Sequence, residues 1–140
     1  MFVEVVFHST FGPTVTEEEI LQDLVQIKRV AFKNNLKGAS LVHSDEILHV
    51  LQGEKGDIEN AINCFESPAY ILKLKKIFRY DMDRLQFSSW KICAASMPLI
   101  QEFLGEDLIP EQDYVKNYLY EKRGPNTSPY RMIAGSILTK

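Results

Sequence analysis

The sequence has few of the residues that cross-link small folds or bind metals. It contains two cysteines, Cys64 and Cys93, which form neither a disulfide framework nor a metal-ligand spacing. Two such cysteines are typical of reduced thiols in a cytosolic protein, so we expect a cytoplasmic location. Strand alternation places His8 on the face opposite Phe7, so we do not expect the three histidines to converge on a metal.

The sequence also lacks a large excess of charge of one sign and lacks long apolar runs. The formal net charge is −3, which gives no general electrostatic attraction to nucleic acid or to an anionic membrane. No apolar run is long enough to span a bilayer. Glu4 interrupts the short apolar start and no cleavage pattern follows, so we expect no signal peptide. The 140 residues, 45% hydrophobic and 25% charged, fit one soluble domain with one core.

The stretch 36–53 organises the rest of the chain. Two apolar runs, 39–43 and 47–52, flank a polar three-residue turn, which predicts a β-hairpin. The second run is apolar on both faces, so we expect a central strand that is covered on both sides. His49 is the polar exception on its face.

Strands and helices alternate around this hairpin. Thr16 and Glu19 form a capping box, and the apolar spacing predicts a helix from Glu17 to Lys33, ended by Asn34 and Asn35. A second helix is predicted from a cap at Asp57 to the break before Pro68. The remaining predicted strands are 2–9, 71–80 and 87–94.

The predicted order is therefore β-α-β-β-α-β-β, which is a ferredoxin-like α+β fold. Right-handed crossovers place both helices on one face of the sheet, the face of Phe7 and His49. The other face is expected to carry Val6, Leu48, Val50, Trp90 and Ile92. Two C-terminal helices, 97–104 and 111–122, are predicted to cover it.

Several residues in this order resemble the BLUF domain, a blue-light sensor that uses FAD. The resemblance rests on the order of elements, on Leu51-Gln52-Gly53, and on Phe87 followed by Trp90. It covers residues 1–95 without a gap. The segment 96–140 is similar to the C-terminal helical extension of short, stand-alone BLUF proteins. Further positions match the family pattern: Pro13, Thr16 and Gly38.

The residues that carry the family's photochemistry are replaced. The family's electron-donating Tyr is Phe7 here, although Ser9 two residues later is kept, and its switching Gln is His49. Phenylalanine has no phenol, and imidazole has no amide to rearrange. The positions that match the family's flavin pocket are Phe7, Ser9, Val30, Ala31, His49, Tyr70, Trp90 and Ile92.

The ring-holding residues are replaced too. The family's Asn in the first helix corresponds to Ala31, preceded by Val30. Its Asp-x-Arg-His segment corresponds to 68–71, which includes Tyr70, and its Met after the Trp corresponds to Ile92.

These replacements leave three functions open for a protein that resembles a sensor. The first is a photoreceptor with an altered pocket, and the second is a flavin binder without the photocycle. The third is a flavin-free regulatory or protein-interaction module. We favour the third, because Val30, Tyr70 and Ile71 add bulk to the pocket. FAD is expected only if the family function is retained.

We expect no enzymatic activity. An acylphosphatase of this fold needs an Arg in the loop after the first strand, and residues 9–12 contain none. No Ser-His-Asp or Cys-His set is visible in the sequence. The aromatic tail predicts a homo-oligomer, with a downstream protein partner that the sequence does not identify. The aromatic positions are Phe103, Tyr114, Tyr118 and Tyr120.

Overall fold

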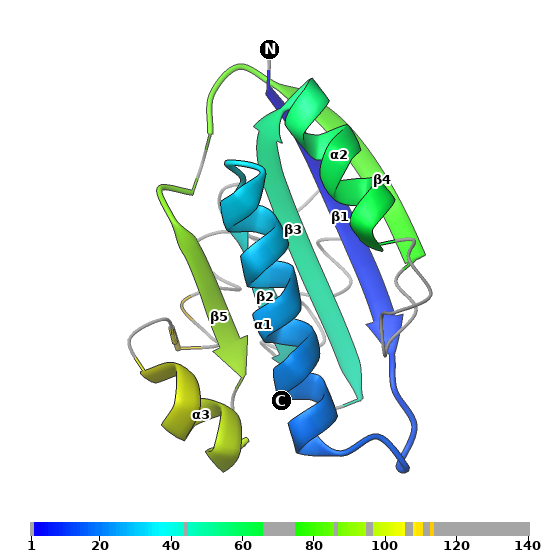
Figure 1. Ribbon diagram of the computed structural model, residues 1–140, viewed down its shortest axis with the longest axis vertical. Coiled ribbons are helices and arrows are strands. Elements are labelled where there is room, and N and C mark those ends of the chain that lie inside the picture. The colour runs from blue at the N-terminus through cyan, green and yellow to red at the C-terminus, as the bar shows by residue number, and fades with distance from the viewer. Residues whose placement is uncertain are drawn as a thin grey trace.

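A mixed five-stranded sheet forms the centre of the described part of the molecule, in the order β4-β1-β3-β2-β5 (Figure 1). The computed structural model describes residues 2–43, 45–65, 75–85, 87–94, 97–105, 108–110 and 113. β2 and β5 pair in parallel, and the other neighbours pair antiparallel. The elements are β1 Phe2–Thr10, α1 Glu17–Lys33, β2 Lys37–His43, β3 Glu46–Glu54, α2 Lys55–Phe65, β4 Lys75–Met82, β5 Trp90–Ala94 and α3 Pro98–Leu104. The predicted α+β fold class is confirmed.

Helix α1 has the predicted bounds because its sequence defines both of its ends. The Glu19 N–H donates to Thr16 Oγ1 over 3.1 Å, and the Thr16 N–H donates to Glu19 Oε1 over 3.2 Å. At the other end Asn34 caps the helix and Asn35 has a φ of 57°, a left-handed conformation that Asn tolerates. Helix α2 instead starts two residues before its predicted cap, so Asp57 lies in its first turn.

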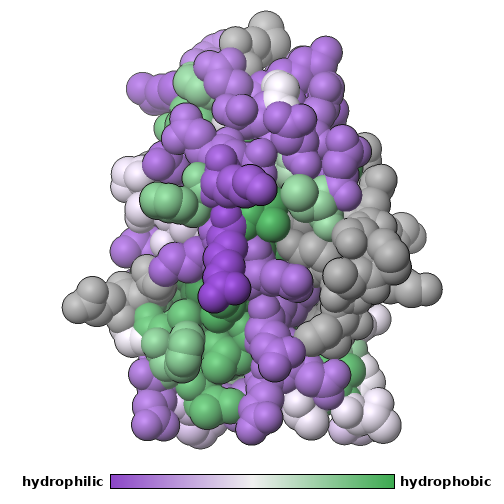
Figure 2. Space-filling model, in the orientation of Figure 1, coloured by the Kyte–Doolittle hydropathy of each residue, from purple (hydrophilic) through white to green (hydrophobic). Residues whose placement is uncertain are grey.

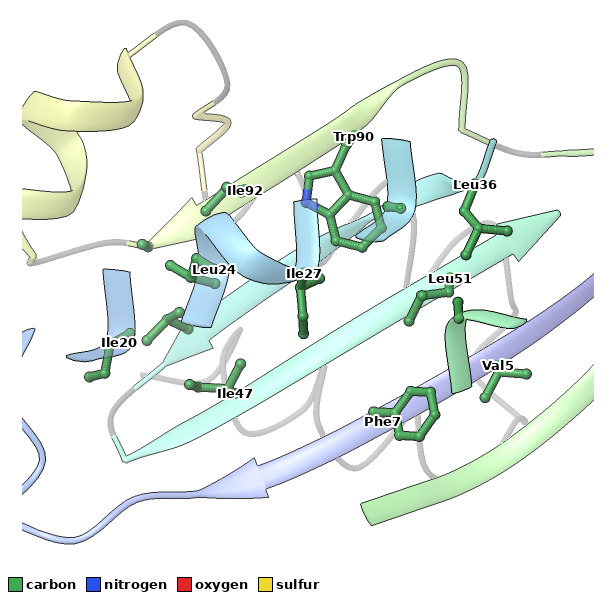
Figure 3. Packing of buried hydrophobic residues seen from close by; sticks show 14 of the residues in the cluster. Val5, Phe7, Ile20, Leu24, Ile27, Leu36, Ile47, Leu51, Trp90 and Ile92 are labelled. Atoms are coloured by element: carbon green, nitrogen blue, oxygen red, sulfur yellow. The ribbon is translucent and has the colours of Figure 1, made fainter. Parts of the chain in front are cut away.

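Both helices pack on the face of the sheet that carries Phe7 and His49, as predicted. Phe7 and His49 are paired directly across β1 and β3, so their side chains share this face. Figure 3 shows apolar side chains that fill the layer between the two helices and the sheet. They include Val5, Phe7, Ile20, Leu24, Ile27, Leu36, Ile47, Leu51, Trp90 and Ile92.

The prediction that Trp90 and Ile92 face the opposite side of the sheet is wrong. Both belong to the core under α1 (Figure 3). β5 pairs in parallel with β2, with Trp90 beside Gly38 and Ile92 beside Ser40, and Ser40 bonds to His49 on the helix side. The register of β5 with β2 therefore decides which β5 side chains face the helices. The alternation of residues within β5 alone does not show this.

Helix α3 lies beside α1 and β5 rather than on the face of Val50. Its buried residues, Ile100 and Leu104, belong to the same core as α1. Glu17 in the first turn of α1 accepts the backbone N–H groups of Leu99 over 2.8 Å and Ile100 over 3.2 Å. These bonds satisfy α3 donors that have no partner within their own helix. The second predicted C-terminal helix, 111–122, lies outside the described residues apart from Asp113.

The opposite face of the sheet is also buried, as expected for a central β3 strand. Leu48 and Val50 are 2% exposed, and Glu4 and Gln52 on the same face are 1% and 0% exposed. Gln52 Nε2 donates to Glu4 Oε2 over 2.6 Å, and the Phe87 N–H donates to Gln52 Oε1 over 3.2 Å. This polar network ties β1 and β3 to the segment before β5. No helix within the described ranges has the length and apolar character needed to cross a membrane.

Candidate functional site

The candidate site is the helix-side surface of the two central strands, where Phe7 and His49 lie side by side. Phe7 is 4% exposed and His49 is fully buried. β1 and β3 position them as a directly opposed pair, and β2 adds Ser40 directly opposite His49. The structure therefore brings together the two positions at which the resemblance expects the donor phenol and the switching amide.

His49 is the centre of a buried polar relay with Ser40 and Asp23. His49 Nδ1 lies 2.6 Å from Ser40 Oγ, and His49 Nε2 lies 3.5 Å from Asp23 Oδ2. All three residues have zero exposure. The relay joins β3 to β2 through a short hydrogen bond and to α1 through the longer contact between His49 and Asp23. It thus links three elements of the core with one imidazole.

Sequence reasoning missed Asp23 and Ser40. Asp23 interrupts the apolar stripe of α1 between Ile20 and Ile27, and a carboxylate in a buried stripe signals a polar partner on the facing sheet. Ser40 is recognisable only from the register of β2 with β3, which pairs it with His49. The sequence thus signals that Asp23 needs a polar partner, but it does not identify His49 as that partner.

The relay has the residue types of a catalytic triad but not its geometry. The 3.5 Å between His49 Nε2 and Asp23 Oδ2 exceeds the length of a good hydrogen bond. Neither Asp23 oxygen nor His49 Nε2 has a hydrogen-bond partner in the described part of the chain. A nucleophilic serine must also reach a substrate, whereas Ser40 is fully buried. The arrangement is therefore suited to holding α1 on the sheet. Within the described residues, no group of three or more His, Cys, Asp or Glu could hold a metal ion.

The other predicted site residues lie at several places in the same layer. Ser9 is 5% exposed, and its hydroxyl donates to the adjacent Thr10 carbonyl over 3.5 Å. Ala31 is fully buried and Val30 is partly buried against the core. Trp90 is 8% exposed, and its indole N–H meets no hydrogen-bond acceptor among the residues that the structure describes. Ile92 is fully buried beside Ser40, and Tyr70 lies outside the described residues.

The described side chains at this surface carry few polar groups. The Phe7 ring offers no donor, Ala31 offers only a methyl group, and His49 is directed at Ser40 and Asp23. Among the described residues, the buried side-chain polar atoms without a hydrogen-bond partner are both Asp23 oxygens, His49 Nε2 and Trp90 Nε1.

Solved structures similar to this chain share its fold at low sequence identity. BlsA in its photo-activated state has a TM-score of 0.55 and 20% identity, over 76% of this chain and 79% of BlsA. The BlsA ground state has a TM-score of 0.55 and 17% identity, over 81% and 83%. A manganese/cyclic-diGMP complex of Klebsiella pneumoniae BlrP1 at pH 9.0 has a TM-score of 0.59 and 14% identity, over 99% of this chain.

Some of the similar structures are of longer proteins, and this chain matches only a part of each of them. The chain spans 33% of BlrP1, and it spans 34% of a bacterial light-regulated adenylyl cyclase at a TM-score of 0.54 and 16% identity. No protein-family model and no curated protein matches the chain. At sequence identities this low, the similar structures show the fold alone. The chain has a BLUF-like fold.

Proposed function

We propose that this chain is a signalling-type module of the BLUF-like fold that works without flavin, through contacts with other proteins. The similar structures include a photo-activated protein and a light-regulated cyclase, which supports a signalling role for the fold. The observation that carries the flavin-free part is the state of His49. It is fully buried, and its two ring nitrogens are directed at Ser40 and Asp23 of the protein itself.

The chemistry of the replaced residues leads to the same proposal. Phe7 cannot donate an electron and a proton as a phenol does, and His49 has no amide to rearrange. Ala31 cannot hydrogen-bond a ring with its side chain. Losing several polar contacts of about 1 kcal/mol each weakens flavin binding by orders of magnitude. The layer under α1 is then filled better by core side chains than by water in an empty ring site.

The absorbance spectrum of the purified protein tests this proposal. We expect protein from a flavin-replete host to be colourless. With FAD added, blue light should produce no small, reversible red shift of the flavin band. A yellow protein without that shift would instead support a flavin binder that lacks the photocycle. A yellow protein with the shift would show a working photoreceptor and overturn the proposal.

Restoring the two central residues should not restore the photocycle. In a Phe7→Tyr, His49→Gln variant we still expect no light-induced red shift, because Ala31 and the segment 68–71 remain unsuited to a ring. The measurement is a light-minus-dark difference spectrum with added FAD, and each single variant serves as its control. A reversible shift in the double variant alone would show that these two positions are sufficient.

One observation favours flavin or a related planar ligand as the second candidate. Trp90 Nε1 and the Asp23 carboxylate are buried polar groups that find no hydrogen-bond partner within the described ranges, and such groups are costly unless something satisfies them. A bound ring could supply these hydrogen bonds. Thermal unfolding with and without excess FAD or FMN separates the candidates, since a ligand of the folded state raises the melting temperature.

Oligomerisation and domain organisation remain part of the proposal. We expect residues 96–140 to form a helical extension of the 1–95 domain, and we expect the tail aromatics to support a homo-oligomer. Among these aromatics Phe103 is described, and it is 67% exposed. Light scattering measures the state directly, and a 16.1 kDa monomer at high concentration would contradict the expected oligomer.

A further inference from the structure

An exposed apolar surface surrounds helix α3, and we call it the α3 patch. Figure 2 shows hydrophobic surface over α3, beside the hydrophilic surface of α1. Phe103 is 67% exposed, whereas Ile100 and Leu104 on the same helix are buried. The patch consists of Pro98, Leu99, Phe103, Leu108, Ile109 and Pro110, each exposed or partly exposed.

The α3 patch lies on a fixed support. Ile100 and Leu104 anchor α3 in the core, and Glu17 binds the backbone at its N-terminal end. The Ile109 N–H donates to the Ile92 carbonyl over 2.9 Å, which attaches the following segment to β5. Helical spacing places Leu99 and Phe103 on a side of α3 away from its buried stripe, so they stay exposed while the helix is docked.

Acidic side chains lie near the patch among the described residues. In the described parts of its own segment, 97–105 and 108–110, Glu102 is the one charged residue, and it is exposed. Glu17 and Glu18 lie in the first turn of α1, where Glu17 contacts α3. Glu102 and Glu18 are exposed and form no ion pair with a described cation. An apolar centre with an acidic rim is complementary to a partner with an apolar face and basic edges.

We propose that the α3 patch binds a basic amphipathic helical segment of a partner protein, one that places apolar side chains on Phe103 and Lys or Arg beside Glu102. This inference rests on the proposed interaction function and gives that partner a chemistry. A second copy of the chain fits this patch less well, so the homo-oligomer expected above is assigned to the other tail aromatics, Tyr114, Tyr118 and Tyr120. A two-fold symmetric contact through the patch would bring the same acidic residues of both copies together.

Two synthetic peptides test the chemistry of the partner. Both have about 18 residues, about five helical turns, with Leu along one face. One carries Lys on its other face and the other carries Glu. Fluorescence anisotropy should show that the Lys peptide binds at least about 10-fold more tightly than the Glu peptide, and that added salt weakens its binding.

Surface variants test the place of binding, and the chain offers a matched control. Phe103→Ala should weaken binding of the Lys peptide by at least about 10-fold, because exposed aromatic anchors carry much of an interface's affinity. Phe32→Ala removes the other large exposed aromatic of the described residues, 88% exposed on α1, and should change nothing. Glu102→Lys should weaken binding of the Lys peptide and strengthen binding of the Glu peptide.

Three results would overturn the inference: equal binding of both peptides, no binding of either, or equal losses from Phe103→Ala and Phe32→Ala. A concentration-dependent dimer that Phe103→Ala dissociates, without peptide binding, would assign the patch to a second copy. The absorbance test is independent of these outcomes. A yellow protein would end the flavin-free proposal and leave peptide binding at α3 standing.

Discussion

Replacing His49 by leucine is expected to destabilise the protein by about 3–5 kcal/mol, because it leaves a buried carboxylate without its neighbouring imidazole. Asp23 has zero exposure, and its Oδ2 lies 3.5 Å from His49 Nε2, its partner among the described residues. Leucine removes that partner and leaves the carboxylate in an apolar layer. The variant also removes the 2.6 Å bond to Ser40.

A double-mutant cycle separates this charge effect from the loss of packing. Urea unfolding followed by the emission of Trp90, the one tryptophan of the chain, gives the free energy of unfolding. Asp23→Leu alone should cost much less, because it leaves an imidazole that still bonds Ser40. In the His49→Leu background, Asp23→Leu should recover most of the loss. Additive losses would show that His49 does not compensate the Asp23 charge.

The fold was predictable because its main signals are local. The capping box at Thr16 and the apolar stripe of α1 fix that helix without reference to the rest of the chain. The β2–β3 hairpin is equally local, and its two-sided apolar strand predicted the central position of β3. The right-handed crossover rule then placed both helices on one face.

The relations that sequence reasoning missed depend on pairing between distant segments. The face of Trp90 depends on the parallel register of β5 with β2, and the position of α3 depends on Glu17, 82 residues before Leu99. In the candidate site, too, local patterns were predictable and distant contacts were not. Alternation within β1 and β3 predicted that Phe7 and His49 share a face, whereas the Ser40 and Asp23 contacts require the tertiary arrangement.

Gly38 is the position where a single methyl group should have the largest effect on folding. Its φ is +149°, a conformation that side-chain-bearing residues rarely adopt. A Cβ at Gly38 would lie 1.8 Å from the Val50 carbonyl oxygen and 3.0 Å from Trp90 Cζ3. The Val50 atom is backbone of the central strand, so it cannot rotate away as a side chain can.

We therefore expect Gly38→Ala to destabilise the protein by more than about 4 kcal/mol, enough to unfold a domain of ordinary stability. Gly56→Ala is the matched control, because a Cβ at Gly56 in α2 would meet nothing within 4 Å. That control should be neutral or stabilising by up to about 1 kcal/mol, since alanine favours the helix. Circular dichroism and urea unfolding of both variants measure the difference. A folded Gly38→Ala protein with the stability of its control would mean that β2 and β3 can separate at this point, and the register that positions Ser40 against His49 would then be wrong.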